Sequence, residues 1–115
     1  MPVIKVWCLP VELHKKDFNE LHQAIVGAVV SVPELGLRDQ NDMTCLFPPD
    51  RMAYGLGEEI IVEISGLFEK PERTDEVRQR LAGRVGTAVS KLFPGAKVEC
   101  FVQVHKPSQG FWTSM

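Results

Sequence analysis

The sequence lacks an apolar run long enough to cross a bilayer, which takes about 20 residues, and no basic segment with an apolar stretch behind it stands at its start. We therefore expect no membrane helix, no signal peptide and a cytoplasmic location. An excess of positive charge is also missing, because 13 Lys and Arg stand against 15 Asp and Glu in 115 residues. This balance argues against nucleic acid or an anionic membrane as a partner.

Cysteine is scarce as well, and the three cysteines form no CxxC pair. Cys8, Cys45 and Cys100 are an odd number, and each lies in an apolar, strand-like run. This pattern favours buried, reduced thiols over disulfides, zinc ligands or redox work. We assign the cysteines no functional role and expect no metal site.

What the sequence does hold is one pattern of elements that occurs twice. Runs rich in β-branched residues predict strands at 3–9, 43–47, 59–67 and 97–104. Apolar residues at helical spacing predict helices over about 17–30 and 74–92. An Asp17-x-x-Glu20 capping box opens the first helix, and Thr74 opens the second.

Two consecutive β-α-β units predict an α+β fold in a single domain, 1–115, with pseudo-repeat halves at about 1–57 and 58–115. Because β-α-β crossover connections are right-handed, we expect both helices on one face of a four-stranded sheet. The strands are apolar on both sides, so the uncovered face should meet another subunit. We expect sheets packed against sheets in a symmetric homo-oligomer, most simply a homotrimer.

A proline stands directly behind Met1, at the head of the first predicted strand. Proline has no N–H to give to a sheet and is tolerated at a strand's first position, so Pro2 has a purely structural explanation. The other explanation is chemical. If Met1 is removed, Pro2 gives the chain a secondary amine at its N-terminus, and such an amine can move protons.

Three stretches together resemble the tautomerase superfamily, and within it the members of the size of macrophage migration inhibitory factor and 5-carboxymethyl-2-hydroxymuconate isomerase. They are Met1-Pro2 followed at once by a strand, FPPDRMAYGLG at 47–57, and QGFWTS at 109–114. Trp112 stands where the cytokine-like members carry a tryptophan. The resemblance covers nearly the whole chain and extends to the smaller enzymes of the 4-oxalocrotonate tautomerase type.

The resemblance implies a homotrimer with an active site at each subunit interface, and a freed Pro2 amine that acts first as general base and then as general acid. Keto-enol tautomerisation needs such a proton shuttle and neither a metal nor a cofactor. An α-amine has a pKa near ~8, and desolvation and nearby cations lower it toward working pH. Retention of Met1 would leave Pro2 as a tertiary amide without a base.

The family holds a carboxylate-bearing substrate with Arg or Lys. Arg38 lies close to the position of the lysine of the cytokine-like members, with a solvated charge beside Asp39 as the alternative. Lys15 stands roughly where the smaller enzymes place an arginine, and is either a substrate clamp or part of a solvated charge run. Tyr54 matches an aromatic of the active-site wall, and Leu67 a residue that lends a backbone group to the pocket. Both also fit simple packing.

Two positions in the fourth predicted strand depart from the family. Glu99 and Phe101 stand where the cytokine-like members carry a tyrosine and an asparagine, so the resemblance implies a different pocket floor. Glu99 either positions a water, as hydration or dehalogenation requires, or lies on the far face of the strand in an ion pair, which we favour. The RTDE stretch at 73–76 resembles the arginine motif of the smaller enzymes but lies in the second half, where we interpret Arg73 as a helix entrance and interface charge.

Three functions follow as hypotheses. The first is a cofactor-independent keto-enol tautomerase, an isomerase of a small 2-keto or 2-hydroxydienoic acid, with Pro2 as acid-base catalyst and Arg38 as carboxylate ligand, provided that Met1 is removed. The second is a hydratase, dehalogenase or decarboxylase of the same superfamily, which needs an acidic or polar residue such as Glu99 beside Pro2. The third is a non-enzymatic oligomeric binding protein on the same scaffold.

Overall fold

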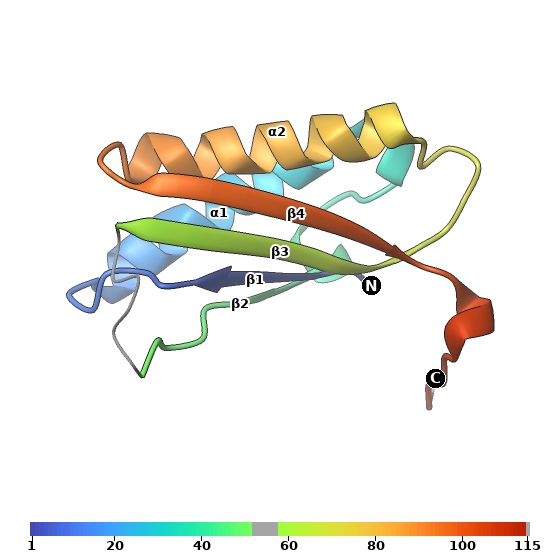
Figure 1. Ribbon diagram of the computed structural model, residues 1–115, viewed down its shortest axis with the longest axis horizontal. Helices are drawn as coiled ribbons and strands as arrows, with labels where there is room; N and C mark the ends of the chain where they lie inside the picture. The colour runs from blue at the N-terminus through green and yellow to red at the C-terminus, as the bar shows by residue number, and fades with distance from the viewer. Residues whose placement is uncertain (52–57, 115) are drawn as a thin grey trace.

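The computed structural model describes residues 1–51 and 58–114, and Figure 1 shows the elements that they form. The strands are β1 (Val3–Trp7), β2 (Thr44–Leu46), β3 (Glu59–Phe68) and β4 (Lys97–His105), and the helices are α1 (Lys15–Val30) and α2 (Asp75–Leu92). Short 3-10 turns lie at Pro33–Leu35, Gln40–Asp42 and Pro107–Gln109. No helix within the described ranges is long and apolar enough to cross a membrane.

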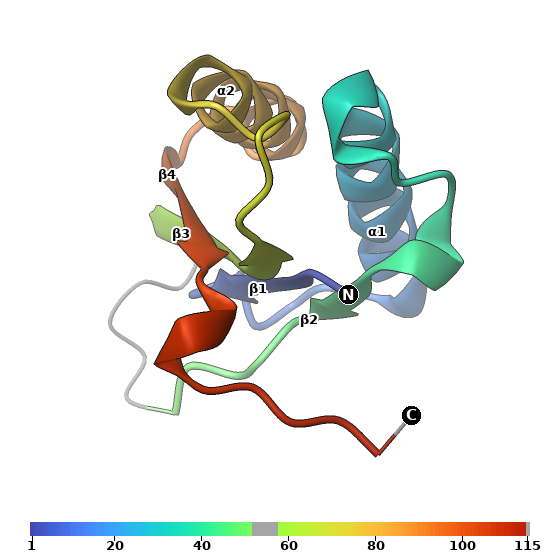
Figure 2. The same cartoon turned by 90° about the vertical axis from the view of Figure 1, so that its right-hand side faces the viewer.

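The strands form a sheet with the order β2-β1-β3-β4. β1 and β2 run parallel, β3 and β4 run parallel, and β1 and β3 meet antiparallel at the centre. The helix of each half connects its two parallel strands, and both helices lie on the same face of the sheet (Figure 2). The predicted α+β fold of two β-α-β units is therefore confirmed.

The two helices begin in different ways. α2 begins behind Thr74, whose hydroxyl oxygen accepts the Val77 N–H at 3.3 Å, as predicted. The capping box predicted from Asp17 is wrong, because the N-cap residue of α1 is His14 and the helix begins at Lys15. Asp17 is the third helical residue, and its carboxylate accepts the His14 N–H at 2.9 Å. Asp17 therefore caps the helix from inside its first turn.

The core lies between the sheet and the helices. Alternate residues of the central strands point into it and are at most 2% exposed: Ile4 and Val6 of β1, and Ile60, Val62 and Ile64 of β3. The helices add Leu21, Ile25 and Val29 from α1, and Val77, Leu81, Val85 and Val89 from α2. Both halves of the chain thus contribute to one core, in which each large apolar side chain stabilises the fold by about 1.5–3 kcal/mol.

The opposite face of the sheet carries no helix. Side chains of the other parity point to it, and Trp7 Nε1 there donates a hydrogen bond to the Glu63 carboxylate. Apolar surface remains open on the two edge strands, since Leu46 of β2 is 44% exposed and Phe101 of β4 is 56% exposed. The chain beyond β4 extends past the sheet on this side (Figure 2). This face is therefore the surface on which a second subunit would pack.

A β-bulge lies near the end of β3, where the pairing with β4 shifts between Ile64 and Leu67. Gly66 lies in this bulge with a φ of +77°. The extra residue changes the alternation of the strand. As a result Leu67 is only 1% exposed, whereas the odd-numbered Ile61 earlier in β3 is only half-buried. The bulge turns the end of β3 toward the start of β1.

Candidate functional site

A cavity of about 330 Å³ lies where β1 starts and β3 ends. Its walls come from Met1 and Pro2, from the segment 36–42 between α1 and β2, and from the end of β3 with the loop behind it. Three residues predicted from the sequence as site residues, Pro2, Arg38 and Leu67, lie together in this cavity. The parallel pairs and the antiparallel centre of the sheet bring these distant parts of the chain to one place.

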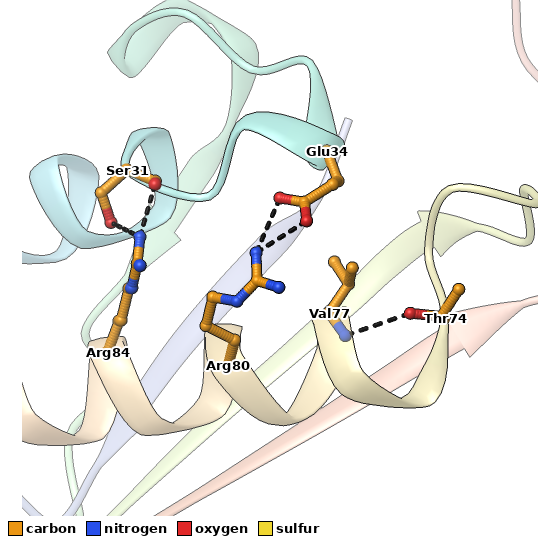
Figure 3. A network of polar contacts seen from close by, with 6 residues as sticks. All are labelled: Ser31, Glu34, Thr74, Val77, Arg80 and Arg84. Atoms are coloured by element: carbon orange, nitrogen blue, oxygen red, sulfur yellow. Dashed lines mark hydrogen bonds and ion pairs between the residues drawn. The ribbon is translucent and has the colours of Figure 1, made fainter.

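A larger groove of about 810 Å³ lies between α1 and α2, but it lacks a group poised for proton transfer. Two of its basic residues, both on α2, bind the end of α1 and the turn that follows it (Figure 3). Arg80 Nη1 donates to both carboxylate oxygens of Glu34 at 2.8 and 2.7 Å, and Arg84 Nη1 donates to the Ser31 carbonyl oxygen. We therefore take the smaller cavity at Pro2 as the candidate site.

Pro2 is held firmly in the wall of this cavity. The residue is buried, and its carbonyl oxygen accepts the Thr44 N–H at 2.9 Å, which fixes it to β2. On the other side Val3 pairs with Ser65 of β3. A proline at the first position of a strand has no N–H to leave unsatisfied. The sheet thus holds the Pro2 nitrogen at the edge of the cavity without a competing hydrogen bond.

Three cationic side chains line the same cavity: Arg38, Lys70 and Arg73. Arg38 lies in a loop that is held by a 2.7 Å hydrogen bond from its own N–H to the Asp42 carboxylate. Lys70 lies in the loop between β3 and α2. Asp42 is the acidic residue among the cavity-lining residues that the structure describes. The cavity therefore has an excess of positive charge, which suits an anionic ligand.

Arg73 is unusual because its charge is buried and, in the described part of the chain, none of its hydrogen-bond partners is a carboxylate. The residue is 7% exposed, and its Nη1 and Nη2 atoms donate to the carbonyl oxygens of Phe68 at 2.8 Å and Leu35 at 3.2 Å. Its Nε is buried and has no hydrogen-bond partner among the described residues. A buried cation without a counter-ion is costly. An anion in the adjoining cavity would compensate this charge.

Three other residues predicted for the site do not line this cavity. Lys15 is the first residue of α1, beyond the far end of β1 from Pro2. Glu99 and Phe101 lie on β4 opposite Ile61 and Glu63, whose side chains point to the open face. Glu99 instead forms a 3.1 Å ion pair with Lys97, which confirms the ion-pair alternative.

The Lys97–Glu99 contact also has an electrostatic effect, since the hydrogen bond that Lys97 Nζ donates to the Glu99 carboxylate raises the pKa of Lys97. Tyr54, predicted for the wall of the site, lies outside the residues that the structure describes.

Two charged residues of the cavity, Lys70 and Asp42, were missed from the sequence, and Arg73 was interpreted as a helix entrance and interface charge rather than as a cavity residue. The structure confirms the helix entrance, since Arg73 directly precedes the N-cap Thr74, and it shows that Arg73 is buried within the chain and lines the cavity. Its position directly before the N-cap Thr74 was the available signal, since a residue there lies at the junction of strand end and helix start. Lys70 and Asp42 carry no such signal, because both stand in polar loops.

The thiols near the core are poor candidates for catalysis. Burial raises the pKa of Cys45 and of Cys100 to about 11 each, so both are protonated at neutral pH. Among the residues that the structure describes, no group of three His, Cys, Asp or Glu side chains could hold a metal ion. Among the described residues, the chemically distinctive groups that line the cavity are Pro2, the three cations and Asp42.

No protein-family model matches the sequence, and no curated protein matches it. Among solved structures, a native fused 4-OT is similar with a TM-score of 0.77 at 16% identity, over 97% of this chain and 92% of that one. A malonate semialdehyde decarboxylase is similar with a TM-score of 0.66 at 16% identity, over 98% and 90% of the two chains. A macrophage migration inhibitory factor of Toxoplasma gondii has a TM-score of 0.65 at 14% identity, over 98% and 97%.

Proposed function

We propose that this chain, which has the fold of the tautomerase superfamily, is a cofactor-independent tautomerase once Met1 has been removed. Its substrate would be a small 2-oxo or 2-hydroxydienoic acid. The observation that carries the proposal is the cavity whose walls include the buried Pro2 together with Arg38, Lys70 and the buried Arg73. A base and cations in one cavity are what proton transfer next to a carbonyl needs.

The freed Pro2 amine removes a proton from the carbon next to the substrate's carbonyl. The electron pair of that C–H bond shifts to form the C=C bond of the enolate, and the carbonyl oxygen takes the negative charge. The resulting ammonium then returns the proton to another atom of the conjugated system, so the amine ends neutral. Burial and the nearby cations both disfavour the protonated amine, which keeps a neutral base available.

The cations divide two tasks. Arg73 and Lys70 lie on the β3 side of the cavity, and Arg38 lies in the loop that follows α1. Arg73 is a buried cation whose hydrogen-bond partners among the described residues are backbone carbonyls and no carboxylate, so it suits the substrate's carboxylate. Arg38 then stabilises the oxygen on which negative charge develops.

The assembly we propose is a homotrimer in which the open sheet faces pack together. Fused 4-OT structures with this fold are described as trimers. The exposed Leu46 and Phe101 on the open face fit such burial. A neighbouring copy would then bring Glu99 and Phe101 of its β4 toward the subunit boundary, which is how these residues could still contribute to a site.

A second candidate is a hydratase or decarboxylase on the same scaffold. It is favoured by Asp42, which places a carboxylate in the cavity with Pro2, where a water molecule would need a base to orient it. The similar malonate semialdehyde decarboxylase is described with decarboxylase and hydratase activities. Glu99, predicted for this task from the sequence, is engaged with Lys97 instead.

The test compares the wild-type chain with Pro2→Ala after mass spectrometry has established that Met1 is absent from both. Exchange of the C3 protons of a 2-oxo acid for deuterium, followed by ¹H NMR, reports proton removal directly. We expect exchange by the wild type and a loss of at least ~100-fold in Pro2→Ala. Pro10→Ala is the matched control, because Pro10 lies in the loop between β1 and α1 and does not line the cavity.

Each outcome has a separate meaning. Equal exchange in Pro2→Ala and the wild type would remove Pro2 from the mechanism. No exchange by either, with hydration of an unsaturated acid that Asp42→Asn abolishes, would favour the second candidate. Binding of a carboxylic acid without turnover would leave a non-enzymatic binding protein.

A further inference from the structure

We propose that Gly66 is a specificity-determining residue: the absence of a side chain there keeps space free beside the Pro2 nitrogen for the substituent on the substrate's reacting carbon. The proposal deepens the proposed function and rests on it. Gly66 and Pro2 line the same cavity, one from the bulge of β3 and the other from the start of β1. The width of the site at the reacting atom is therefore set where these two strands meet.

The local geometry shows which space is at stake. A Cβ placed on Gly66 would lie 3.0 Å from the Met1 carbonyl oxygen and 3.5 Å from Pro2 Cα. The Met1 carbonyl carbon is bonded to the Pro2 nitrogen, so it marks the side on which a freed amine has its hydrogen and lone pair. A carbon that gives its proton to this amine must lie on that side, about 3–3.5 Å from the nitrogen. A side chain at residue 66 would occupy the same space.

Pro2 cannot move away from such a side chain without breaking the sheet. The Thr44 N–H binds the Pro2 carbonyl oxygen at 2.9 Å, and Val3 pairs with both Thr44 and Ser65. The crowding would therefore remain beside the amine. A side chain at residue 66 would therefore clash with a bound substrate, because the protein does not shift to make room.

The backbone conformation alone does not explain the glycine, as the first half of the chain shows. Lys5 and Glu63 face each other in the central pair of strands. Cys8 follows Lys5 by three residues, just as Gly66 follows Glu63, and the two have nearly the same φ, +68° and +77°. A residue with a side chain thus adopts this left-handed conformation at the equivalent end of β1. What distinguishes Gly66 is its approach to Met1 and Pro2.

The experiment uses Gly66→Ala in chains from which Met1 has been removed, with Gly110→Ala as the matched control. Gly110 also has a positive φ, +107°, but a Cβ there would meet nothing within 4 Å. Formaldehyde or benzaldehyde with cyanoborohydride alkylates the N-terminal amine through an iminium that the hydride reduces, with loss of water. Fragmentation mass spectrometry then measures the labelled fraction at Pro2. This readout does not depend on catalysis.

We expect Gly66→Ala to lower benzylation of Pro2 by at least tenfold while methylation stays within twofold of the wild type. Gly110→Ala should leave both rates unchanged. In deuterium exchange, Gly66→Ala should lose at least tenfold more activity on phenylpyruvate than on 2-oxobutanoate. Equal losses on both substrates, or unchanged benzylation, would overturn the proposal and show a structural effect only.

The outcomes separate this inference from the function on which it rests. If Pro2→Ala retains full exchange, the proposed function fails whatever Gly66→Ala does. If Pro2→Ala loses exchange but Gly66→Ala behaves like Gly110→Ala, the function stands and the role of Gly66 is wrong. A purified chain that keeps Met1 has no amine at Pro2 and contradicts both.

Discussion

The two β-α-β halves of the chain share one architecture but differ at the equivalent ends of their first strands. β1 starts behind Pro2 and ends at Trp7, directly before Cys8, whereas β3 starts at Glu59 and has a bulge at Gly66 shortly before its end at Phe68. The candidate site combines the start of the first half with the end of the second. At the other end of these two strands, where β3 starts and β1 ends, β3 begins with the acidic Glu59 and no proline stands before it.

This difference shows how a fold with two similar halves can place a candidate catalytic residue at the start of only one of its two central strands. The two halves contribute alike to the core, but only β1 begins behind a residue whose removal frees an amine. The cations of the cavity are also unevenly divided, since Lys70 and Arg73 lie in the loop before α2 and only Arg38 comes from the first half. We infer that the symmetric part of the molecule provides stability and that the asymmetric part provides the proposed chemistry. The predictions below test these two statements in turn.

The largest effect concerns the symmetric core. Leu21 of α1 and Leu81 of α2 are both 0% exposed, so Leu21→Ala and Leu81→Ala should each lower the free energy of unfolding by about 3 kcal/mol. Urea denaturation of the two variants measures this loss. If the losses of unfolding free energy in the two variants differ by more than ~2 kcal/mol, the core is not shared evenly between the halves.

The next effect concerns the asymmetric cations. Arg73→Gln should lower kcat/KM by at least ~100-fold, about 2.7 kcal/mol of transition-state stabilisation, because it removes the buried charge to which we assign the substrate's carboxylate. Lys15→Gln changes a cation at the start of α1, outside the cavity, and should leave kcat/KM within twofold. Because Arg73 also bonds two backbone carbonyls, circular dichroism must show that Arg73→Gln is folded at the assay temperature. Equal kcat/KM values for Arg73→Gln and Lys15→Gln would contradict the special role of the cations that line the cavity.

The smallest effect concerns the contact that ties the halves together. The hydrogen bond from Arg80 holds the pKa of Glu34 below its ordinary 4.5. A lowered carboxyl pKa adds stability above the unfolded value and loses it as the pH falls through the folded one. The wild type should thus be slightly more stable than Glu34→Gln at pH 7, and the gap should close in acid, as the pH falls from 4.5 through the lowered pKa of Glu34. Chemical denaturation at both pH values measures it, with Glu20→Gln on exposed α1 surface as control. A gap that persists at low pH would contradict the ion pair.

Much of the fold could be predicted because it depends on local periodicity. The β-branched run at Ile60–Ile64 and the helical spacing from Val77 to Val89 are visible in the sequence, and the structure buries residues of both. The start of α1 was wrong because Asp17 satisfies a backbone N–H equally well as an N-cap residue or at the third helical position. Local pattern does not separate these two registers.

The site could be predicted only in part. Pro2, Arg38 and Leu67 were found because a resemblance pointed to them. Arg73 was misjudged because its burial arises only when the strand end and the segment around Leu35 close over it. The bulge at Gly66 depends on pairing between β3 and β4, which are distant in sequence from each other. Such contacts have no signature in a single stretch of residues.

The central claim is that cations from both sides of the cavity act on the freed Pro2 amine, and the pH dependence of kcat/KM tests it most directly. The acid limb of this profile reports protonation of the free enzyme's base. We predict a limb whose midpoint lies below the ~8 of an ordinary α-amine and moves to higher pH in Arg38→Gln and further in Arg38→Gln with Lys70→Gln, because fewer positive charges oppose the ammonium. A limb that stays in place in both variants would contradict the account.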